Sequence, residues 1–321
     1  MKTWIAAAAG MMLSAGGALA QAWDMPTPYG DATFHTQNIA QFADDLREAT
    51  DGALDITVHS AGSLFPHAEI KNAVRSRQVP IGEFLLSRLS NEDAAYGLDT
   101  QPFLATSYEQ AQKLWEAQKP VITELLAEEG LMPLFSVPWP AQGLYTNGEI
   151  AGVDGLGGLR FRAYNASLEE FAQIVGAAPV QVEAPDIPQA FSTGQVEAMI
   201  TSPSTGANSS AWDFVSHFSP INAWLPKNIV VVNQRVFDGL DEATQAAVMD
   251  AAAAAEQRGW EMSATEAEEK TAVLAENGVE VYAPSDALMA ELLDVGTQML
   301  ETWEDAASDQ AKSILTGYQS N

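Results

Sequence analysis

Cysteine is absent from this chain of 321 residues, and basic residues are scarce, with 15 Lys and Arg against 43 Asp and Glu. Without cysteine there is no disulfide, thiolate zinc site, cysteine nucleophile, cysteine-ligated iron–sulfur cluster or lipid-anchored cysteine. A formal net charge of −28 argues against nucleic-acid binding, because such a surface repels phosphates. An anionic ligand remains compatible with this charge, since physiological salt screens charges over about 8 Å and a local cation can dominate.

Signatures of catalysis and metal binding are missing too. The sequence contains no G-x-S-x-G, Walker A or H-E-x-x-H motif. Its four histidines do not fall at metal-ligand spacings, and we interpret His59 and His67 as surface or hydrogen-bonded residues. We therefore predict no metal, no cofactor and no catalytic site, although the many carboxylates leave an acid–base pair open.

No apolar run approaches the roughly 20 residues that a membrane-spanning helix needs. The chain begins with a short basic segment and an apolar stretch from Trp4 to Leu13, and Ala18-Leu19-Ala20 fits the small-x-small pattern of a cleavage site. We expect residues 1–20 to be a signal peptide cleaved after Ala20. The mature protein is then expected to be soluble and free in a bacterial periplasm.

The rest of the chain is typical of an α/β protein, because apolar residues make up 47% of it and switch between strand and helix periodicity. Leu54, Ile56 and Val58 alternate as in a strand, after a helical pattern from Ile39 to Leu46. Repeated units of this kind predict a mainly parallel sheet covered by helices. A further helix, opened by Ser107, should break or kink at Pro120.

The second half predicts another α/β unit. Leu159 to Tyr164 alternates as a strand, residues 243–276 form a long helix, and Asp286 to Ala306 forms a final one. We predict two lobes of the periplasmic binding protein fold, with a ligand cleft between them and a long C-terminal helix spanning them. The predicted lobes comprise residues 21–139 with 228–267, and residues 140–227 with 268–321.

Arginine is the most informative residue type, because only eight are present and two lie on one predicted cleft strand, at Arg160 and Arg162. A guanidinium group matches a carboxylate with two parallel N–H donors. From chemistry alone, Arg162 could serve equally as a ligand contact or as half of an internal salt bridge.

Several segments resemble the DctP family of substrate-binding proteins from tripartite ATP-independent periplasmic (TRAP) transporters. Residues 158–162, Gly-Leu-Arg-Phe-Arg, resemble the family's G-L-K-x-R segment, with Arg160 in place of lysine. Residues 52–58 resemble its G-x-L-x-I-x-V strand, residues 99–104 its D-x-x-P-F-L stretch, and residues 189–198 its A-L-x-T-G-x-V-D-A segment. The order and spacing of these segments cover nearly the whole mature chain.

The resemblance implies a receptor that captures an organic acid for a membrane permease, with Arg162 pairing the ligand carboxylate and with Asn165 and Arg88 at further contact positions. Gln142 lies where some relatives place another arginine, which leaves a second fixed carboxylate site in doubt. Ser202 is a candidate for a ligand hydroxyl or carbonyl group. The remaining candidates are apolar or aromatic residues near the cleft: Tyr29, Phe84, Trp139 and Trp212.

These residues favour a monocarboxylate with an apolar or aromatic body. A C4-dicarboxylate is the close alternative. A binding protein of an ATP-driven importer and a periplasmic hydrolase or lyase are the other classes left open. We expect a monomer that works with TRAP permease subunits.

Overall fold

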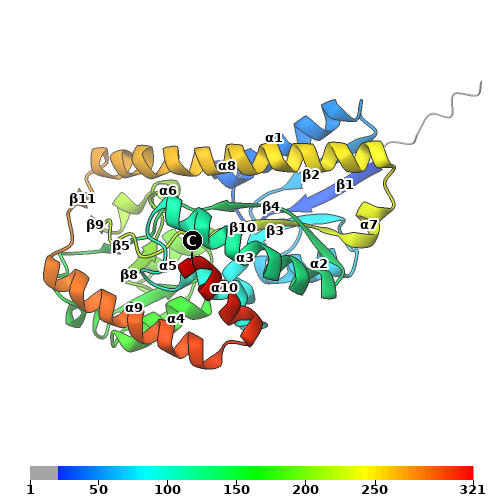
Figure 1. Cartoon of the computed structure of the whole chain (residues 1–321). Coiled ribbons are helices and arrows are strands. Elements are labelled where there is room, and N and C mark those ends of the chain that lie inside the picture. The colour runs from blue at the N-terminus through cyan, green and yellow to red at the C-terminus, as the bar shows by residue number, and fades with distance from the viewer. Residues whose placement is uncertain (1–20, 321) are drawn as a thin grey trace, which may run out of the picture.

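The computed structural model describes residues 21–320, so the predicted signal peptide lies outside the described residues. The chain forms two α/β lobes side by side (Figure 1). The first lobe contains a pair of strands and a three-stranded sheet of order β3-β10-β4. Its strands are β1 (Gln21–Pro26), β2 (Leu54–His59), β3 (Ile81–Leu85), β4 (Leu131–Pro138) and β10 (Lys227–Asn233).

The second lobe is built on one six-stranded sheet of order β11-β9-β5-β8-β6-β7. Its strands are β5 (Gly143–Thr146), β6 (Arg160–Ala163), β7 (Ala178–Gln181), β8 (Ala198–Thr201), β9 (His217–Ser219) and β11 (Glu280–Val281). Strand β6 runs parallel to both of its neighbours, β7 and β8. The carboxyl ends of these three strands therefore meet at one edge of the sheet, where open α/β sheets usually bind ligands.

The strand pairing is mixed, so the prediction of a mainly parallel sheet was wrong. The β1–β2 pair is parallel, as the β–α–β pattern indicated. However, β10 is antiparallel to β3 and β4, and β5 is antiparallel to β8 and β9. The reason lies in the connections: β10 returns from the second lobe, as predicted, and enters between β3 and β4 in the opposite direction.

The helices cover these sheets and join the lobes. They are α1 (Phe34–Ala49), α2 (His67–Arg75), α3 (Tyr108–Glu128), α4 (Ala166–Ile174), α5 (Ile187–Ser192), α6 (Pro203–Asn208), α7 (Gln234–Asp238), α8 (Glu242–Glu276), α9 (Asp286–Ala306) and α10 (Asp309–Ser320). Short 3-10 turns, among them η1 (Leu86–Leu89), η2 (Ala94–Thr100) and η4 (Ala184–Asp186), lie between them.

Helix α8 runs along both lobes (Figure 1), packing on α1 and β4 in the first and on α6 and β11 in the second. Gly259 permits the approach to β4, because a Cβ atom there would collide with Val137. The predicted helix over residues 243–276 is thus confirmed, and it supplies the main spanning element. The terminal helix α9 packs on α4 of the second lobe and reaches the first at Trp303, whose indole N–H donates to Ala94 O at 2.9 Å.

Two details of the helices differ from expectation. Helix α3 continues through Pro120 without a break, since Leu114, Ile122 and Leu126 on either side are fully buried and hold it against the core. Helix α10 packs on α3, with Ile314 in the same apolar core. This packing places the last helix with the first lobe, whereas residues 268–321 were assigned to the second.

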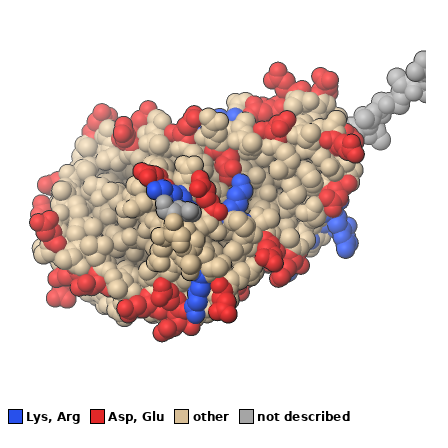
Figure 2. Space-filling view, in the orientation of Figure 1, with Lys and Arg blue, Asp and Glu red and all other residues tan. Residues whose placement is uncertain are grey.

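Two chain segments cross between the lobes beside each other. Trp139 N–H donates to Pro226 O at 2.8 Å, and Gln142 N–H donates to Trp224 O at 3.0 Å. The crossings between β4 and β5 and between β9 and β10 therefore form one hydrogen-bonded strap next to the interlobe pocket. Asp and Glu side chains are scattered over the visible face, and Lys and Arg are few (Figure 2). Within residues 21–320, no helix has both the length and the apolar character needed to cross a bilayer.

Candidate ligand-binding site

A pocket of about 380 Å³, its mouth included, lies between the lobes. The first lobe contributes residues that follow β1, open α2 and end β3, and the crossing strap contributes three more. The second lobe contributes the carboxyl ends of β6, β7 and β8 and one turn of α6. The lining residues are Tyr29, His67, Leu85, Trp139, Gln142, Arg162, Tyr164, Glu183, Ala184, Thr201, Thr205 and Pro226.

Arg162 is the central cation of this pocket. Its side chain lies on β6 and is only 3% exposed. Nε donates to Val182 O at 3.0 Å, which fixes the guanidinium plane. Among residues 21–320, its Nη1 finds no hydrogen-bond partner. Burial lowers the pKa of Arg162 to about 10, so the group is still charged at neutral pH. A buried charged donor without a partner is costly, and a ligand anion is the natural explanation for it.

Tyr164 contacts the Arg162 guanidinium group, and Gln142 holds Tyr164 in place. The guanidinium carbon lies 5.1 Å from the centroid of the Tyr164 ring, in a cation–π contact. The Tyr164 hydroxyl accepts a hydrogen bond from Trp224 Nε1 at 3.0 Å and donates to Gln142 Oε1 at 3.3 Å. Gln142 Nε2 in turn donates to Pro140 O at 2.8 Å. These hydrogen bonds attach Tyr164 to the crossing strap.

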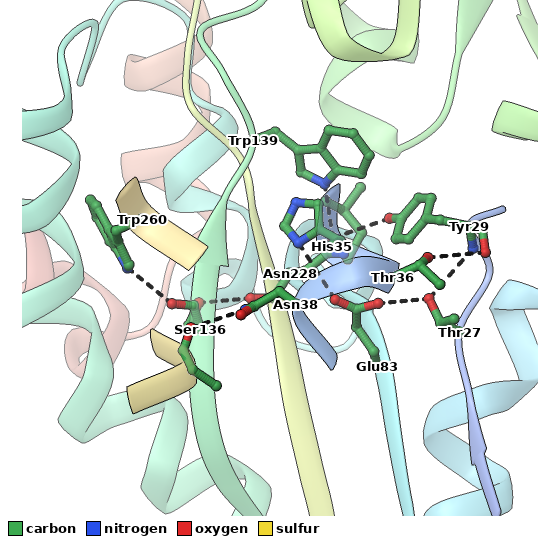
Figure 3. Close-up of polar contacts among 12 residues, drawn as sticks. Thr27, Tyr29, His35, Thr36, Asn38, Glu83, Ser136, Trp139, Asn228 and Trp260 are labelled. Carbon is green, nitrogen blue, oxygen red and sulfur yellow. Dashed lines mark hydrogen bonds and ion pairs between the residues drawn. The ribbon is translucent and has the colours of Figure 1, made fainter. Parts of the chain in front are cut away.

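Aromatic side chains form one wall of the pocket. The Tyr29 and Trp139 rings meet edge to face, with centroids 4.9 Å apart. Asn228 Oδ1 accepts hydrogen bonds from the Tyr29 hydroxyl at 3.1 Å and from Trp139 Nε1 at 3.0 Å (Figure 3). One amide oxygen therefore fixes both rings. With Leu85, they give an apolar surface suited to a small ring or chain.

Behind this wall lies a buried acid–base group (Figure 3). His35 packs against Trp139, with ring centroids 4.4 Å apart, and its Nδ1 lies 3.5 Å from Glu83 Oε1. Thr27 donates its hydroxyl hydrogen to Glu83 Oε2 at 2.6 Å. Burial lowers the pKa of His35 although Glu83 opposes the shift, so the imidazole is neutral at pH 7. This group supports the aromatic wall from within the first lobe.

Among the described residues, Glu183 is the one carboxylate that lines the pocket, and two groups of the first lobe hold it. Arg88 Nη1 donates to Glu183 Oε1 at 2.7 Å, and His67 Nδ1 lies 3.3 Å from Oε2. Arg88 Nη1 also donates to Tyr164 O at 3.1 Å. These contacts tie the two lobes together at the side of the pocket.

The nine predicted site residues fall into two groups. Arg162, Gln142, Trp139 and Tyr29 come together around the pocket. The other five lie outside it. Arg88 donates to Glu183 without lining the pocket itself. Asn165 caps α4, because its Oδ1 accepts from Leu168 N, and its Nδ2 donates to Ser87 Oγ of the first lobe at 2.9 Å.

The remaining three side chains pack in the protein or cap a helix and do not line the pocket. Phe84 is buried in the core of the first lobe, because alternation along β3 turns its neighbour Leu85 toward the pocket instead. Ser202 caps α6, with its Oγ accepting from Thr205 N at 3.0 Å. Trp212 packs against a core cluster of the second lobe.

Sequence reasoning missed several residues that line the pocket: His67, Leu85, Glu183, Thr201 and Thr205. A signal for two of them was present. Glu183 follows β7 and Thr201 ends β8, and both strands lie beside β6. Side chains at the carboxyl ends of neighbouring parallel strands share one edge of the sheet, which is where Arg162 also lies.

Comparison with known proteins agrees with this geometry. Residues 28–306 match the family model of DctP, bacterial extracellular solute-binding protein family 7. The crystal structure of DctP7, a Bordetella pertussis extracytoplasmic solute receptor binding pyroglutamic acid, is 41% identical with a TM-score of 0.92, and the alignment covers 94% of this chain and 100% of that one.

Two further relatives were found. A marine metagenome TRAP solute-binding protein specific for pyroglutamate is 38% identical, with a TM-score of 0.92 and coverage of 94% of this chain and 99% of that one. A solute-binding protein of Albidiferax ferrireducens is 23% identical over 283 residues, covering 86% of this chain and 82% of the relative. The resemblance inferred from the sequence motifs is confirmed: the chain belongs to the DctP family of TRAP-type extracytoplasmic solute-binding proteins, family 7.

Proposed function

We propose that this protein is the TRAP receptor for pyroglutamate, a five-membered lactam with a single carboxylate. The observation that carries the proposal is the buried Arg162, whose charged Nη1 donor has no hydrogen-bond partner within residues 21–320. Relatives with 41% and 38% identity bind pyroglutamate. The ligand class also agrees with the monocarboxylate favoured by the sequence.

The pocket offers a partner for each part of this ligand. The carboxylate pairs with Arg162, and the flat ring lies against Trp139 and Tyr29. The lactam carbonyl oxygen needs a donor, and the Thr205 hydroxyl can supply one, because it accepts from Ser202 Oγ at 3.1 Å and keeps its own hydrogen for the ligand. The receptor holds and releases this ligand without changing it.

The C4-dicarboxylate alternative is disfavoured by the charges of the pocket. A second ligand carboxylate would lie near Glu183, and two carboxylates in a partly buried site repel each other. Arg88, which could have neutralised it, is already bonded to Glu183 at 2.7 Å. A monoanion fits this arrangement better.

Residues 1–20 direct export and are cleaved after Ala20, and the mature chain works as a periplasmic monomer. Its lobes comprise residues 21–139 with 228–267, and residues 140–227 with 268–308, and the last helix joins the first lobe. Closure of the lobes around the ligand creates the outer surface that the TRAP permease recognises.

A thermal-shift screen of organic acids tests the ligand assignment. The mature protein is freed of co-purified ligand by unfolding and refolding, then mixed with L-pyroglutamate, malate, succinate and 2-oxoisovalerate. At 100 times its dissociation constant a ligand adds about 2.7 kcal/mol to the free energy of unfolding, so a clear shift is expected with L-pyroglutamate. Mass spectrometry of the ligand after incubation should recover it unaltered. A shift with succinate or malate but not with pyroglutamate would overturn the assignment.

A further inference from the structure

Glu183 has an unusual position for a carboxylate in the binding site of an acid. It follows β7 in the second lobe and lines the same pocket as Arg162. Its two oxygens are engaged by residues of the first lobe, Arg88 and His67. A carboxylate that served only to join the lobes would not need to line the pocket. Because Glu183 does line it, we expect this side chain to contact the ligand.

The protonation of His67 follows from its other contact. Leu85 N–H donates to His67 Nε2 at 3.1 Å, so Nε2 carries no hydrogen and Nδ1 carries it toward Glu183. Glu183 thus receives one donor on each oxygen. Burial alone would raise the pKa of Glu183, but the His67 hydrogen bond and the charges of Arg88 and Arg162 hold it below its ordinary value.

An ionised carboxylate only accepts hydrogen bonds, and its two oxygens together offer about four acceptor sites. Arg88 and His67 occupy two of these, which leaves acceptor capacity toward the pocket. The site therefore combines a guanidinium group whose Nη1 has no partner within residues 21–320 and one fixed acceptor. The chemistry that complements both is a carboxylate with an N–H donor on the same small ligand.

We propose that Glu183 is a specificity residue that accepts the lactam N–H of the ligand, while Arg88 and His67 are positioning residues that fix its carboxylate. This role rests on the proposed function, since it assigns a partner to the ring nitrogen of pyroglutamate. It explains how the receptor separates a lactam acid from a keto or hydroxy acid of similar size. A site built to accept an N–H rejects an analogue without it, because the acceptor is left unpaired.

The test compares two ligands that differ at this single group. In 3-oxocyclopentane-1-carboxylate a CH₂ replaces the lactam N–H, while the carboxylate and the carbonyl keep their ring positions. Titration calorimetry with the ligand-free protein should show pyroglutamate binding at least about 30-fold more tightly than the ketone. In Glu183→Gln this ratio should fall by about five- to tenfold, since a neutral acceptor makes a weaker hydrogen bond than a charged one.

Arg160→Gln is the matched control. It removes an exposed ion pair with Glu197 outside the pocket and leaves Glu183, Arg88 and His67 in place, so it should change the affinity for either ligand less than about twofold and preserve their ratio. If Glu183→Gln weakened both ligands equally, Glu183 would be only a structural contact between the lobes and the proposal would be overturned. A wild-type protein that binds both ligands equally would overturn it too, while leaving the pyroglutamate assignment intact. Failure of the wild type to bind pyroglutamate would instead overturn the proposed function, and this role with it.

Discussion

The two ends of strand β6 carry the same residue type in opposite circumstances. At its amino end, the Arg160 side chain is 49% exposed and forms an ion pair with Glu197 at 3.0 Å. At its carboxyl end, Arg162 is almost fully buried in the interlobe pocket, and its Nη1 has no partner within residues 21–320. The two side chains share one face of the strand and are separated by one residue.

This contrast shows how an acidic protein can bind an acid. At the exposed end, a carboxylate of the chain pairs with Arg160 in contact with water, and such an ion pair contributes little to the free energy of folding. At the carboxyl end of β6, the lobes and the aromatic wall exclude water, and Glu183, the nearby carboxylate, is bonded to Arg88 and His67. The charge of Arg162 is therefore reserved for a ligand, whatever the net charge of the surface.

Replacing the buried arginine of β6, Arg162, should have the largest effect on ligand affinity. Arg162→Ala should weaken pyroglutamate binding by about 30- to 5,000-fold, because it leaves the ligand carboxylate buried without its charge partner. Titration calorimetry measures the loss. The ligand-free variant should unfold at the same temperature as wild type or higher, since a buried unsatisfied group is removed; a large drop in melting temperature would show that Arg162 is structural.

A smaller loss is expected when the charge is kept and the shape is changed. Arg162→Lys retains a cation but cannot present two parallel N–H donors or stack on Tyr164 as a plane. We expect pyroglutamate affinity to fall by about tenfold, between wild type and Arg162→Ala. Affinity equal to wild type would mean that a point charge suffices and that the bidentate geometry is wrong.

Stability and ligand affinity should depend differently on pH, because histidine titrates near neutral pH and Arg162 does not. Burial lowers the pKa of both His35 and His67, although Glu83 and Glu183 oppose the shift. Below the unfolded value of about 6.5, the unfolded chain therefore takes up protons that the folded chain does not, and the free energy of unfolding should fall. The slope contributed by each histidine is at most about 1.4 kcal/mol per pH unit.

Urea unfolding at pH 7.5 and 5.5 measures this loss, which His35→Gln should reduce. Pyroglutamate affinity should stay within about twofold over the same range, because Arg162 and a ligand α-carboxylate (pKa about 3.5) both keep their charge. A rise in affinity of about tenfold from pH 7.5 to pH 5.5 would indicate that a histidine, which gains its charge at the lower pH, and not the guanidinium group, holds the carboxylate.

The exposed end of β6 should give the smallest effect. Arg160→Gln removes an exposed ion pair with Glu197, which is expected to cost less than about 1 kcal/mol of stability and to change affinity less than twofold. Calorimetry and thermal unfolding test both numbers. A loss of binding here as large as that in Arg162→Ala would remove the distinction between the two ends.

Much of this fold was predictable from local patterns. Alternation at Leu54, Ile56 and Val58 gave β2, and the alanine- and glutamate-rich segment gave α8, because both elements follow from periodicity and propensity. The strand direction of β10 could not be read in this way. Its residues would suit either orientation, and only the path of the chain back from the second lobe makes it antiparallel.

The site was predictable only in part for a related reason. Arg162, Gln142, Trp139 and Tyr29 lie close to motif or crossing segments, so their positions could be inferred. Phe84 was placed in the site instead of Leu85 because a shift of one residue along a strand exchanges its two faces. Glu183 and His67 come from different lobes, and their meeting depends on tertiary closure that no local pattern encodes.

A crystal structure of the protein with L-pyroglutamate tests the central claim most directly. Both carboxylate oxygens should lie within hydrogen-bond distance of the Arg162 guanidinium group, about 2.7–2.9 Å for charged pairs, with the ring against Trp139 and Tyr29. A ligand carboxylate bound elsewhere, with Nη1 of Arg162 paired to a group of the chain itself, would contradict the distinction between the two ends of β6.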